Sequence, residues 1–452
     1  MICFRHAPRT QRETAKRRLK AGRRMLLGAG LLAGGLTAAS ADAAGFYVQE
    51  QSARGAGRAY SGEAADTGIQ SAWWNPAAIA RLQAPEAYVG GQAILVAADV
   101  DDAGSTIQRP GQPSAAVGGQ PGQSNPLQRG LAPSAGFAYP LGERAAIGVS
   151  VTAPFDFTNK YGAESWTRYD ALKSRVADAN VGVLAALRVT GGLDVGVGLD
   201  AQYASATLTQ ALPNLSPQLP DAQQRLSGSG WDFGWNAGAQ YHAGERLTLA
   251  ASYRSKIRHS LRGKVSVTGL LGPLEAANMT ARGSATFNTP WIATLGARLR
   301  ASDRLWINVQ VQRIGWGEFG AIAVSLPGAT QEIPQDYSDT TSVAAGLDYQ
   351  PASTPGWAFR AGVQYDPTPT PAASRSTRVP DGDRWLFGVG ASHRLADGMT
   401  LDANANYVAF ADTRVRRDDV AFGGTPAATP ISLRGAVSGH AVVLGAGLSW
   451  RF

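Results

Sequence analysis

The stretch Asp194–Tyr203, with the sequence DVGVGLDAQY, decides the fold class. Apolar side chains occupy every second position from Val195 to Tyr203, and Asp, Gly or Gln stands at each position between them. Period two is the side-chain period of a β-strand, so the stretch predicts a strand with one apolar and one polar face. The same alternation recurs at 305–312, 401–407 and 442–452. These segments predict an all-β protein with strands longer than the usual length of about five or six residues.

Short and long connections alternate along the chain. Tight turns rich in Gly, Pro or Asp are predicted at Pro140–Arg144, Thr190–Gly192, Ala243–Glu245, Ala301–Arg304 and Ala396–Gly398. Longer polar stretches lie near 98–130, 154–177, 210–229, 259–281, 323–338, 367–382 and 413–435. This layout is typical of a transmembrane antiparallel β-barrel, with short periplasmic turns and long external loops. We expect about 14 strands over residues 85–452, with both ends of the barrel on the periplasmic side.

The composition agrees with a barrel in lipid. Beyond Pro85 no continuously apolar window exceeds about ten residues, which is too short for the roughly 20 that a membrane-spanning helix needs. A closed barrel is the other structure that pairs all its backbone groups inside a bilayer. Six aromatic residues on the apolar faces lie near strand ends, as in the interface girdles of a barrel: Tyr203, Trp231, Tyr253, Trp291, Tyr407 and Trp450. Aromatic residues at period two that pack a soluble β core are the alternative.

Residues 1–43 are predicted to be a secretory signal peptide. Nine basic residues precede or adjoin a short apolar stretch from Met25 to about Ala39, which ends in the small-x-small site Ala41-Asp42-Ala43. A retained anchor and, from Arg23-Arg24, a twin-arginine signal are the alternatives. Without these residues the chain has 33 basic and 32 acidic residues, so the formal net charge falls from +8 to +1. A nucleic-acid partner loses its support, and the outer membrane of a Gram-negative bacterium is expected.

Residues 44–84 do not alternate, and they precede the first expected strand. Their apolar side chains would be costly in water, at about 25 cal/mol per Å² of exposed area. We therefore expect an N-terminal hatch that plugs the barrel lumen.

Several motifs resemble the FadL family, the outer-membrane transporters of long-chain fatty acids and aromatic hydrocarbons. They run in order through nearly the whole expected mature chain: Ala44-Gly45-Phe46, Gly57 to Glu63, Asn75-Pro76-Ala77, Trp231 to Gly238, Ala251 to Ser255, Tyr365-Asp366, Val379 to Arg384 and Trp450-Arg451-Phe452. The resemblance implies a 14-stranded barrel blocked by a hatch, with gate residues Phe46, Gly57, Asn75, Pro76 and Ala77. It also implies that Phe452 is recognised by the barrel assembly machinery.

The resemblance further implies passive uptake of a hydrophobic compound, which leaves sideways near a kinked third strand, here Ala145–Phe155 with Pro154. The candidate substrate-binding residues are Trp73, Trp74, Phe155, Phe157, Arg254, Lys256 and Arg258. The three cations are expected to share the polar lumen face with Ser252, where they would attract an anion, or else to line the wall or contact lipopolysaccharide. Gln210 stands where fatty-acid members have a basic residue, so neutral hydrocarbons remain an alternative.

Two rival functions are weighed against uptake. A general diffusion porin would need an open polar constriction, which the apolar hatch opposes. An outer-membrane hydrolase would need a nucleophile or metal motif, and none of the histidines beyond residue 43 lies in one. No cofactor and no metal is expected. Solvated charge is favoured over a calcium site for the aspartates of the long loops: Asp99, Asp101, Asp102, Asp381, Asp383, Asp418 and Asp419.

Overall fold

The computed structural model describes residues 45–326 and 329–452. The predicted signal peptide, residues 1–43, lies outside the described residues. Among the described residues, no helix has both the length and the apolar character needed to cross a membrane.

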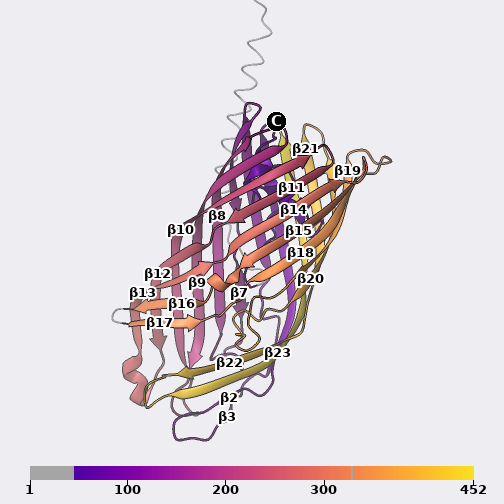
Figure 1. The fold of residues 1–452 in the computed structure, drawn as a ribbon. Helices are drawn as coiled ribbons and strands as arrows, with labels where there is room; N and C mark the ends of the chain where they lie inside the picture. Colours follow the sequence, from indigo (N-terminus) through magenta and orange to yellow (C-terminus); the bar gives the residue numbers. More distant parts are fainter. Residues whose placement is uncertain (1–44, 327–328) are drawn as a thin grey trace, which may run out of the picture. The chain divides into compact units, whose positions relative to one another are not determined.

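The described chain forms one antiparallel sheet that closes on itself (Figure 1). The first strand pairs with the last along its whole length, from Glu86↔Arg451 to Asp102↔Gly435. The first twelve segments are β1 (Glu86–Asp102), β2 (Thr106–Ile107), β3 (Ala115–Ala116), β4 (Gly122–Ser124), β5 (Gly130–Leu141), β6 (Ala145–Thr152), β7 (Phe157–Lys160), β8 (Lys173–Arg188), β9 (Leu193–Leu212), β10 (Ala222–Ala243), β11 (Leu247–Arg254) and β12 (Ile257–Thr268). The others are β13 (Met279–Thr289), β14 (Trp291–Arg300), β15 (Leu305–Gly315), β16 (Ala321–Leu326), β17 (Ala329–Pro334), β18 (Thr340–Tyr349), β19 (Trp357–Asp366), β20 (Arg384–Arg394), β21 (Met399–Phe410), β22 (Thr413–Ala421) and β23 (Thr429–Arg451).

The wall is a closed barrel of 14 strands, as the sequence predicts. Six of these strands are interrupted, so each consists of two consecutive segments: β6–β7, β11–β12, β13–β14, β15–β16, β17–β18 and β21–β22. The short segments β2, β3 and β4 belong to the first long connection. The short helix η4 (Gly272–Ala277) lies in the connection between β12 and β13, and η5 (Trp316–Glu318) lies at the interruption between β15 and β16. The five tight turns fall between strands where they are predicted.

The predicted bounds of one strand and of three loops are wrong. The expected third strand, Ala145–Phe155, ends at Thr152, because Pro154 has no N–H to give to the ladder, and it resumes as β7 at Phe157. The polar stretches expected as loops at 210–229, 259–281 and 413–435 are largely strand, in β9, β10, β12, β13, β22 and β23. Here the outward face lies beyond the lipid and is polar, while apolar side chains such as Leu208, Leu226 and Leu261 face inward, so these segments lack the apolar outward face of the lipid-spanning part.

Large apolar side chains cover the outer surface of the wall. Leu199, Phe233 and Leu295 are 69%, 74% and 62% exposed. The polar residues that alternate with them are buried inside, among them Asp200 and Gln202. Such a surface is stable only in a membrane, where the apolar outer face contacts lipid hydrocarbon instead of water.

Residues 45–84 lie inside the barrel and carry four short helices, α2 (Ala53–Ala56), η1 (Glu63–Ala65), η2 (Ile69–Ser71) and η3 (Pro76–Ile79) (Figure 1). We call these residues the hatch. Nearly all of its residues are buried. Glycines in the wall make room for it: a Cβ on Gly196 would lie 2.4 Å from the Ala77 nitrogen, and one on Gly362 would lie 2.1 Å from the Arg58 carbonyl oxygen.

Candidate functional site

The third wall strand leaves its neighbour and pairs with the hatch. Its ladder with β5 runs from Leu141↔Ala145 to Ala135↔Val151, and contact resumes where Gln128 N donates to Thr158 O. Between these points Phe155 forms an antiparallel bridge with Tyr47 of the hatch. Two backbone hydrogen bonds support the bridge, from Val48 N to Pro154 O (2.7 Å) and from Asp156 N to Phe46 O (3.2 Å). The wall is therefore interrupted where the start of the hatch is held.

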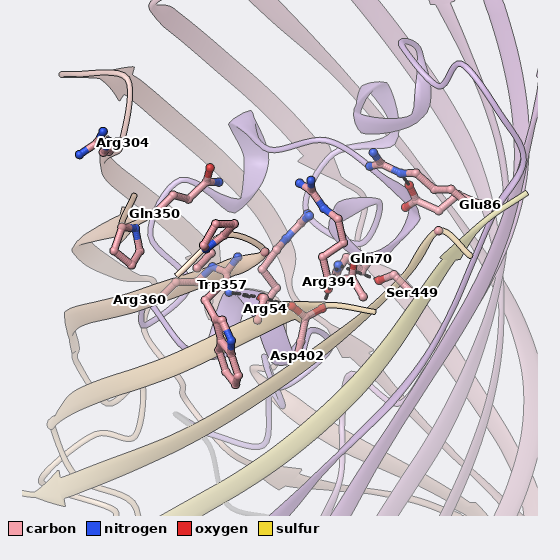
Figure 2. A pocket seen from close by; sticks show the side chains of 18 of the residues that line it. Arg54, Gln70, Glu86, Arg304, Gln350, Trp357, Arg360, Arg394, Asp402 and Ser449 are labelled. Carbon is pink, nitrogen blue, oxygen red and sulfur yellow. Dashed lines mark hydrogen bonds and ion pairs between the residues drawn. The ribbon is translucent and has the colours of Figure 1, made fainter. Parts of the chain in front are cut away.

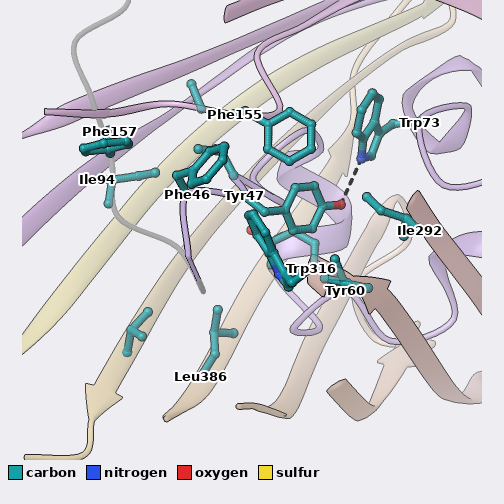
Figure 3. Packing of buried hydrophobic residues seen from close by; sticks show 14 of the residues in the cluster. Phe46, Tyr47, Tyr60, Trp73, Ile94, Phe155, Phe157, Ile292, Trp316 and Leu386 are labelled. Atoms are coloured by element: carbon teal, nitrogen blue, oxygen red, sulfur yellow. Dashed lines mark hydrogen bonds between the residues drawn. The ribbon is translucent and has the colours of Figure 1, made fainter. Parts of the chain in front are cut away.

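An aromatic cluster surrounds this junction (Figure 3). The ring of Phe46 lies 4.9 Å from Trp316, 5.0 Å from Phe319, 5.8 Å from Phe155 and 6.0 Å from Phe157, centroid to centroid. Most of these pairs meet edge to face, the geometry that aromatic quadrupoles favour. Phe46 of the hatch thus contacts both the interruption of the third strand, at Phe155 and Phe157, and the η5 region of the wall, at Trp316 and Phe319.

An apolar cavity opens beside Phe46. It lies between the start of the hatch and the outer halves of β8, β9, β10, β12 and β13. One charged residue, Arg378, is among its lining residues: Phe46, Phe157, Val176, Ala206, Leu208, Leu226, Leu261, Ala285, Phe287, Phe319, Ile322, Gln335, Arg378 and Val379. A second, more polar cavity shares Leu208, Leu226 and Arg378 and extends to the outer connections. The two cavities therefore adjoin each other at these three residues.

Arg378 is positioned by the loop between β19 and β20. Its Nη2 donates to Gln210 Oε1 (2.5 Å), its Nη1 donates to Ser174 Oγ (3.2 Å), and its Nε lies 3.7 Å from Asp170 Oδ1. Burial alone would raise the pKa of Asp170, but Arg378 and Arg417 bring it below its usual value. Position 210 is a glutamine and not a cation, but the guanidinium of Arg378 lies against it. Sequence reasoning missed Arg378, because nothing in the sequence relates this loop to β9.

Ion pairs hold the body of the hatch. Arg58 is fully buried and pairs with Glu63, with Asp66 (2.6 Å) and with Asp348 of β18 (3.2 Å). Arg298 of β14 also pairs with Asp66 and Asp348. Each carboxylate in this group has at least one cationic partner, so the hatch and the wall share a single buried ionic network.

The Asn75-Pro76-Ala77 motif anchors the end of the hatch. Asn75 Oδ1 accepts from Ala77 N (2.9 Å) and caps η3, while Asn75 Nδ2 donates to Ala64 O and to Ala239 O of β10. Pro76 occupies the first helical position, where a missing N–H costs nothing. Gly57 lies against Gly390 of β20, where a Cβ would come within 2.9 Å of the Gly390 Cα.

Arg254 holds the hatch in place. Its guanidinium lies 3.7 Å from the centroid of a Trp73 ring, donates to Trp73 O (2.9 Å) and pairs with Asp200. Trp73 in turn donates to the Tyr47 hydroxyl (3.1 Å), and Trp74 stacks on Tyr60. These two tryptophans pack the hatch and do not line the apolar cavity.

The predicted common lumen face of Arg254, Lys256 and Arg258 is wrong. Between the pairs Asn236↔Arg254 and Ser229↔Arg262, the β11–β12 strand has one residue more than β10. This bulge reverses the faces, so Lys256 and Arg258 are exposed on the outer surface. Lys256 pairs there with Glu318 (2.9 Å).

Two buried carboxyl groups stand near the start of the hatch. Burial raises the pKa of Glu50 to about 7, against the lowering effect of Arg384. Burial likewise raises the pKa of Asp381 to about 6, and this side chain accepts from Gly45 N (2.9 Å) and from Thr368 Oγ1 (2.6 Å). The external loop thus fastens the first described residue of the hatch.

A polar cavity with about 1330 Å³ of empty space lies at the barrel end that carries the short turns (Figure 2). We call it the vestibule. Charged side chains of the hatch and the wall line it, including Arg54, Arg360 and Asp402, and Arg360 pairs with Asp348 (2.6 Å). Across residues 45–326 and 329–452, no cluster of three His, Cys, Asp or Glu side chains is arranged to hold a metal.

Fold and site define a class: a membrane β-barrel whose lumen is plugged and whose apolar cavity lies above the plug. The family model described as "Outer membrane protein transport protein (OMPP1/FadL/TodX)" matches residues 34–452. The chain belongs to this family. It is a transport protein of the Gram-negative outer membrane and not an enzyme.

Named relatives agree with this assignment. The long-chain fatty acid transport protein of Escherichia coli O6:H1 is 27% identical over 412 residues, which cover 82% of this chain and 88% of that protein. Outer membrane protein P1 of Haemophilus influenzae is 24% identical over 410 residues, 82% of this chain and 87% of that protein. Among solved structures, a Pseudomonas aeruginosa FadL homologue superposes with a TM-score of 0.78 at 23% identity, covering 90% of this chain and 100% of that chain. The Ralstonia pickettii toluene transporter TbuX superposes at 0.62 with 20% identity, covering 90% and 99%.

Proposed function

We propose that this protein takes up hydrophobic compounds passively and releases them sideways through the interrupted third strand into the outer membrane. The apolar cavity beside Phe46 supports the proposal, because it offers space for an apolar solute next to the interruption of the third strand. In this proposal residues 1–43 are removed as a signal peptide, and residues 44–84 act as the gate.

The chemistry of the lumen favours the lateral exit over the axial one. Towards the periplasm, a solute would have to cross the ionic network of Arg58 and then the charged vestibule. An apolar molecule gains nothing from either, and its passage would require burying these charges against hydrocarbon. Movement through the wall keeps the solute in apolar surroundings throughout.

The substrate class depends on Arg378. One of the named relatives is a fatty acid transport protein and one of the solved structures is a toluene transporter, so both chemistries are candidates. Arg378 donates to a neutral amide oxygen, Gln210 Oε1, and a carboxylate would be a stronger acceptor at the same place. We therefore propose long-chain carboxylates as substrates, with neutral hydrocarbons as the alternative.

The variant Arg378→Met tests this choice. We expect its affinity for a long-chain carboxylate to fall by about 10- to 100-fold, the worth of a charge-assisted hydrogen bond. Affinity for a neutral alkane of the same length should stay unchanged. Binding of both ligands in detergent measures the effect, and Arg313→Met, which alters an exposed arginine paired with Asp339, is the matched control. Equal loss for both ligands, or no loss for either, would argue against a head-group site at Arg378.

Two partner assignments belong to the same proposal. The exposed C-terminal ring of Phe452 supports recognition by the barrel assembly machinery. Exposed cations on the outer face support contact with lipopolysaccharide.

A further inference from the structure

A basic patch faces outward on three neighbouring strands, β10, β12 and β13. It consists of Arg225, Arg258, Arg262, Lys264 and Arg282, and all five residues are exposed. Within the described part of the chain, no ion pair or side-chain hydrogen bond engages any of them. The nearby acids Glu318 and Asp232 already face Lys256 and His259.

The strand register brings like charges together. Lys264 lies directly opposite Arg282 on β13, and Arg262 is two residues along on the same face. On the other side, Ser266 of β12 is opposite Arg225 of β10. Like charges directly opposite on a sheet repel each other and destabilise it, unless an anion lies between them. The patch is otherwise lined by small hydroxyl residues, Ser227, Ser229, Ser260 and Ser284, which leave the cations accessible.

The patch lies directly above the lipid-facing band. Along the outward face of β10, Arg225, Ser227 and Ser229 are followed by Trp231, Phe233 and Trp235, which are 55%, 74% and 50% exposed. Trp231 meets Tyr203 of β9 at 5.3 Å, and Tyr253 stacks with Trp291, so aromatic rings mark the boundary between the two zones. A ligand that covers both zones needs an anionic head and apolar chains.

We propose that this patch binds the phosphate groups of a phosphorylated, acylated glycolipid of the outer leaflet. The phosphates lie between Lys264, Arg282 and Arg262, and the acyl chains lie along Trp231 and Phe233. The site is on the outer wall and is separate from the transport cavity. The inference rests on the contact with lipopolysaccharide proposed above, and it is independent of which solute the protein carries.

The triple variant Arg262→Ser/Lys264→Ser/Arg282→Ser tests the proposal. Purified protein in neutral detergent is titrated with bis-phosphorylated lipid A and, separately, with the same lipid after enzymatic removal of its phosphates. We expect the native chain to prefer the phosphorylated lipid by at least about tenfold, and the triple variant to bind both lipids equally. A control with the same change in charge is Arg144→Ser/Arg246→Ser/Arg304→Ser, at the opposite end of the barrel, which should keep the preference.

Serine already occupies neighbouring positions of this face, so the barrel should still form, and its heat-modifiable electrophoretic mobility verifies this. Native protein without a preference would overturn the proposal. A triple variant that keeps the preference would overturn it too, as would a control variant that loses it to the same extent.

Discussion

The double variant Tyr47→Cys/Phe155→Cys is expected to lose uptake by about tenfold or more when oxidised, and to regain it on reduction. Residues paired across an antiparallel bridge have Cα atoms about 4.5–5.5 Å apart, which is within the range of a disulfide. The two residues form such a bridge here. A covalent link would fix the hatch to the third strand and keep the cavity closed towards the wall. Transport of a radiolabelled long-chain carboxylate into cells measures the effect.

A second cysteine pair controls for the presence of a disulfide. Ala361 and Val389 are directly opposite on β19 and β20, away from the start of the hatch. Their cross-link should leave uptake unchanged. No other cysteine interferes, since Cys3 is the only native cysteine and lies in the proposed signal peptide. If the oxidised Tyr47/Phe155 pair transports as well as the reduced one, movement at this junction is not part of transport.

The second large effect is expected from Arg58→Ala, which should raise ion conductance severalfold in planar bilayers. The change removes a cation that faces Glu63, Asp66 and Asp348 inside the lumen. Breaking a buried ion pair from one side typically costs about 3–5 kcal/mol, because the remaining charges are left without compensation. We therefore expect the hatch to be released in a fraction of molecules, and water and ions would then fill the lumen.

Arg304→Ala is the matched control, because Arg304 is exposed and lines the vestibule without an ion pair among the described residues. Its conductance should equal that of the native protein. A general diffusion porin would already conduct before either change. High native conductance, or an Arg58→Ala variant that remains closed, would therefore contradict a plug held by this network.

Much of the barrel could be predicted from the sequence because lipid imposes period two on the wall. Val195 to Tyr203 alternates for this reason, and β9 contains it. The outer end of β9 lacks an apolar outward face because it extends beyond the lipid, and its Leu208 lines the cavity inside instead. The bulge after Arg254 could not be predicted either, because no feature of the sequence marks the one extra residue that reverses the faces of Lys256 and Arg258.

The site was only partly predictable for a related reason. Phe46 and Phe157 stood out as aromatics beside the hatch and the kink, and both line the cavity. Leu208 and Leu226 resemble any other strand residue, and Arg378 resembles any other loop cation. They acquire a role only when β9, β10 and the loop after β19 come together, which depends on the closure of the whole barrel.

Photolabelling with a long-chain carboxylate that carries a diazirine at its tail tests the lateral route most directly. The account predicts cross-links to Phe157, Leu208 and Leu226 in the cavity, and to Leu131 and Pro154 at the interrupted wall. It predicts none in the vestibule, at Arg54, Asp402 or Ser449. Vestibule cross-links in yields equal to those of the wall would contradict lateral release and establish an axial path.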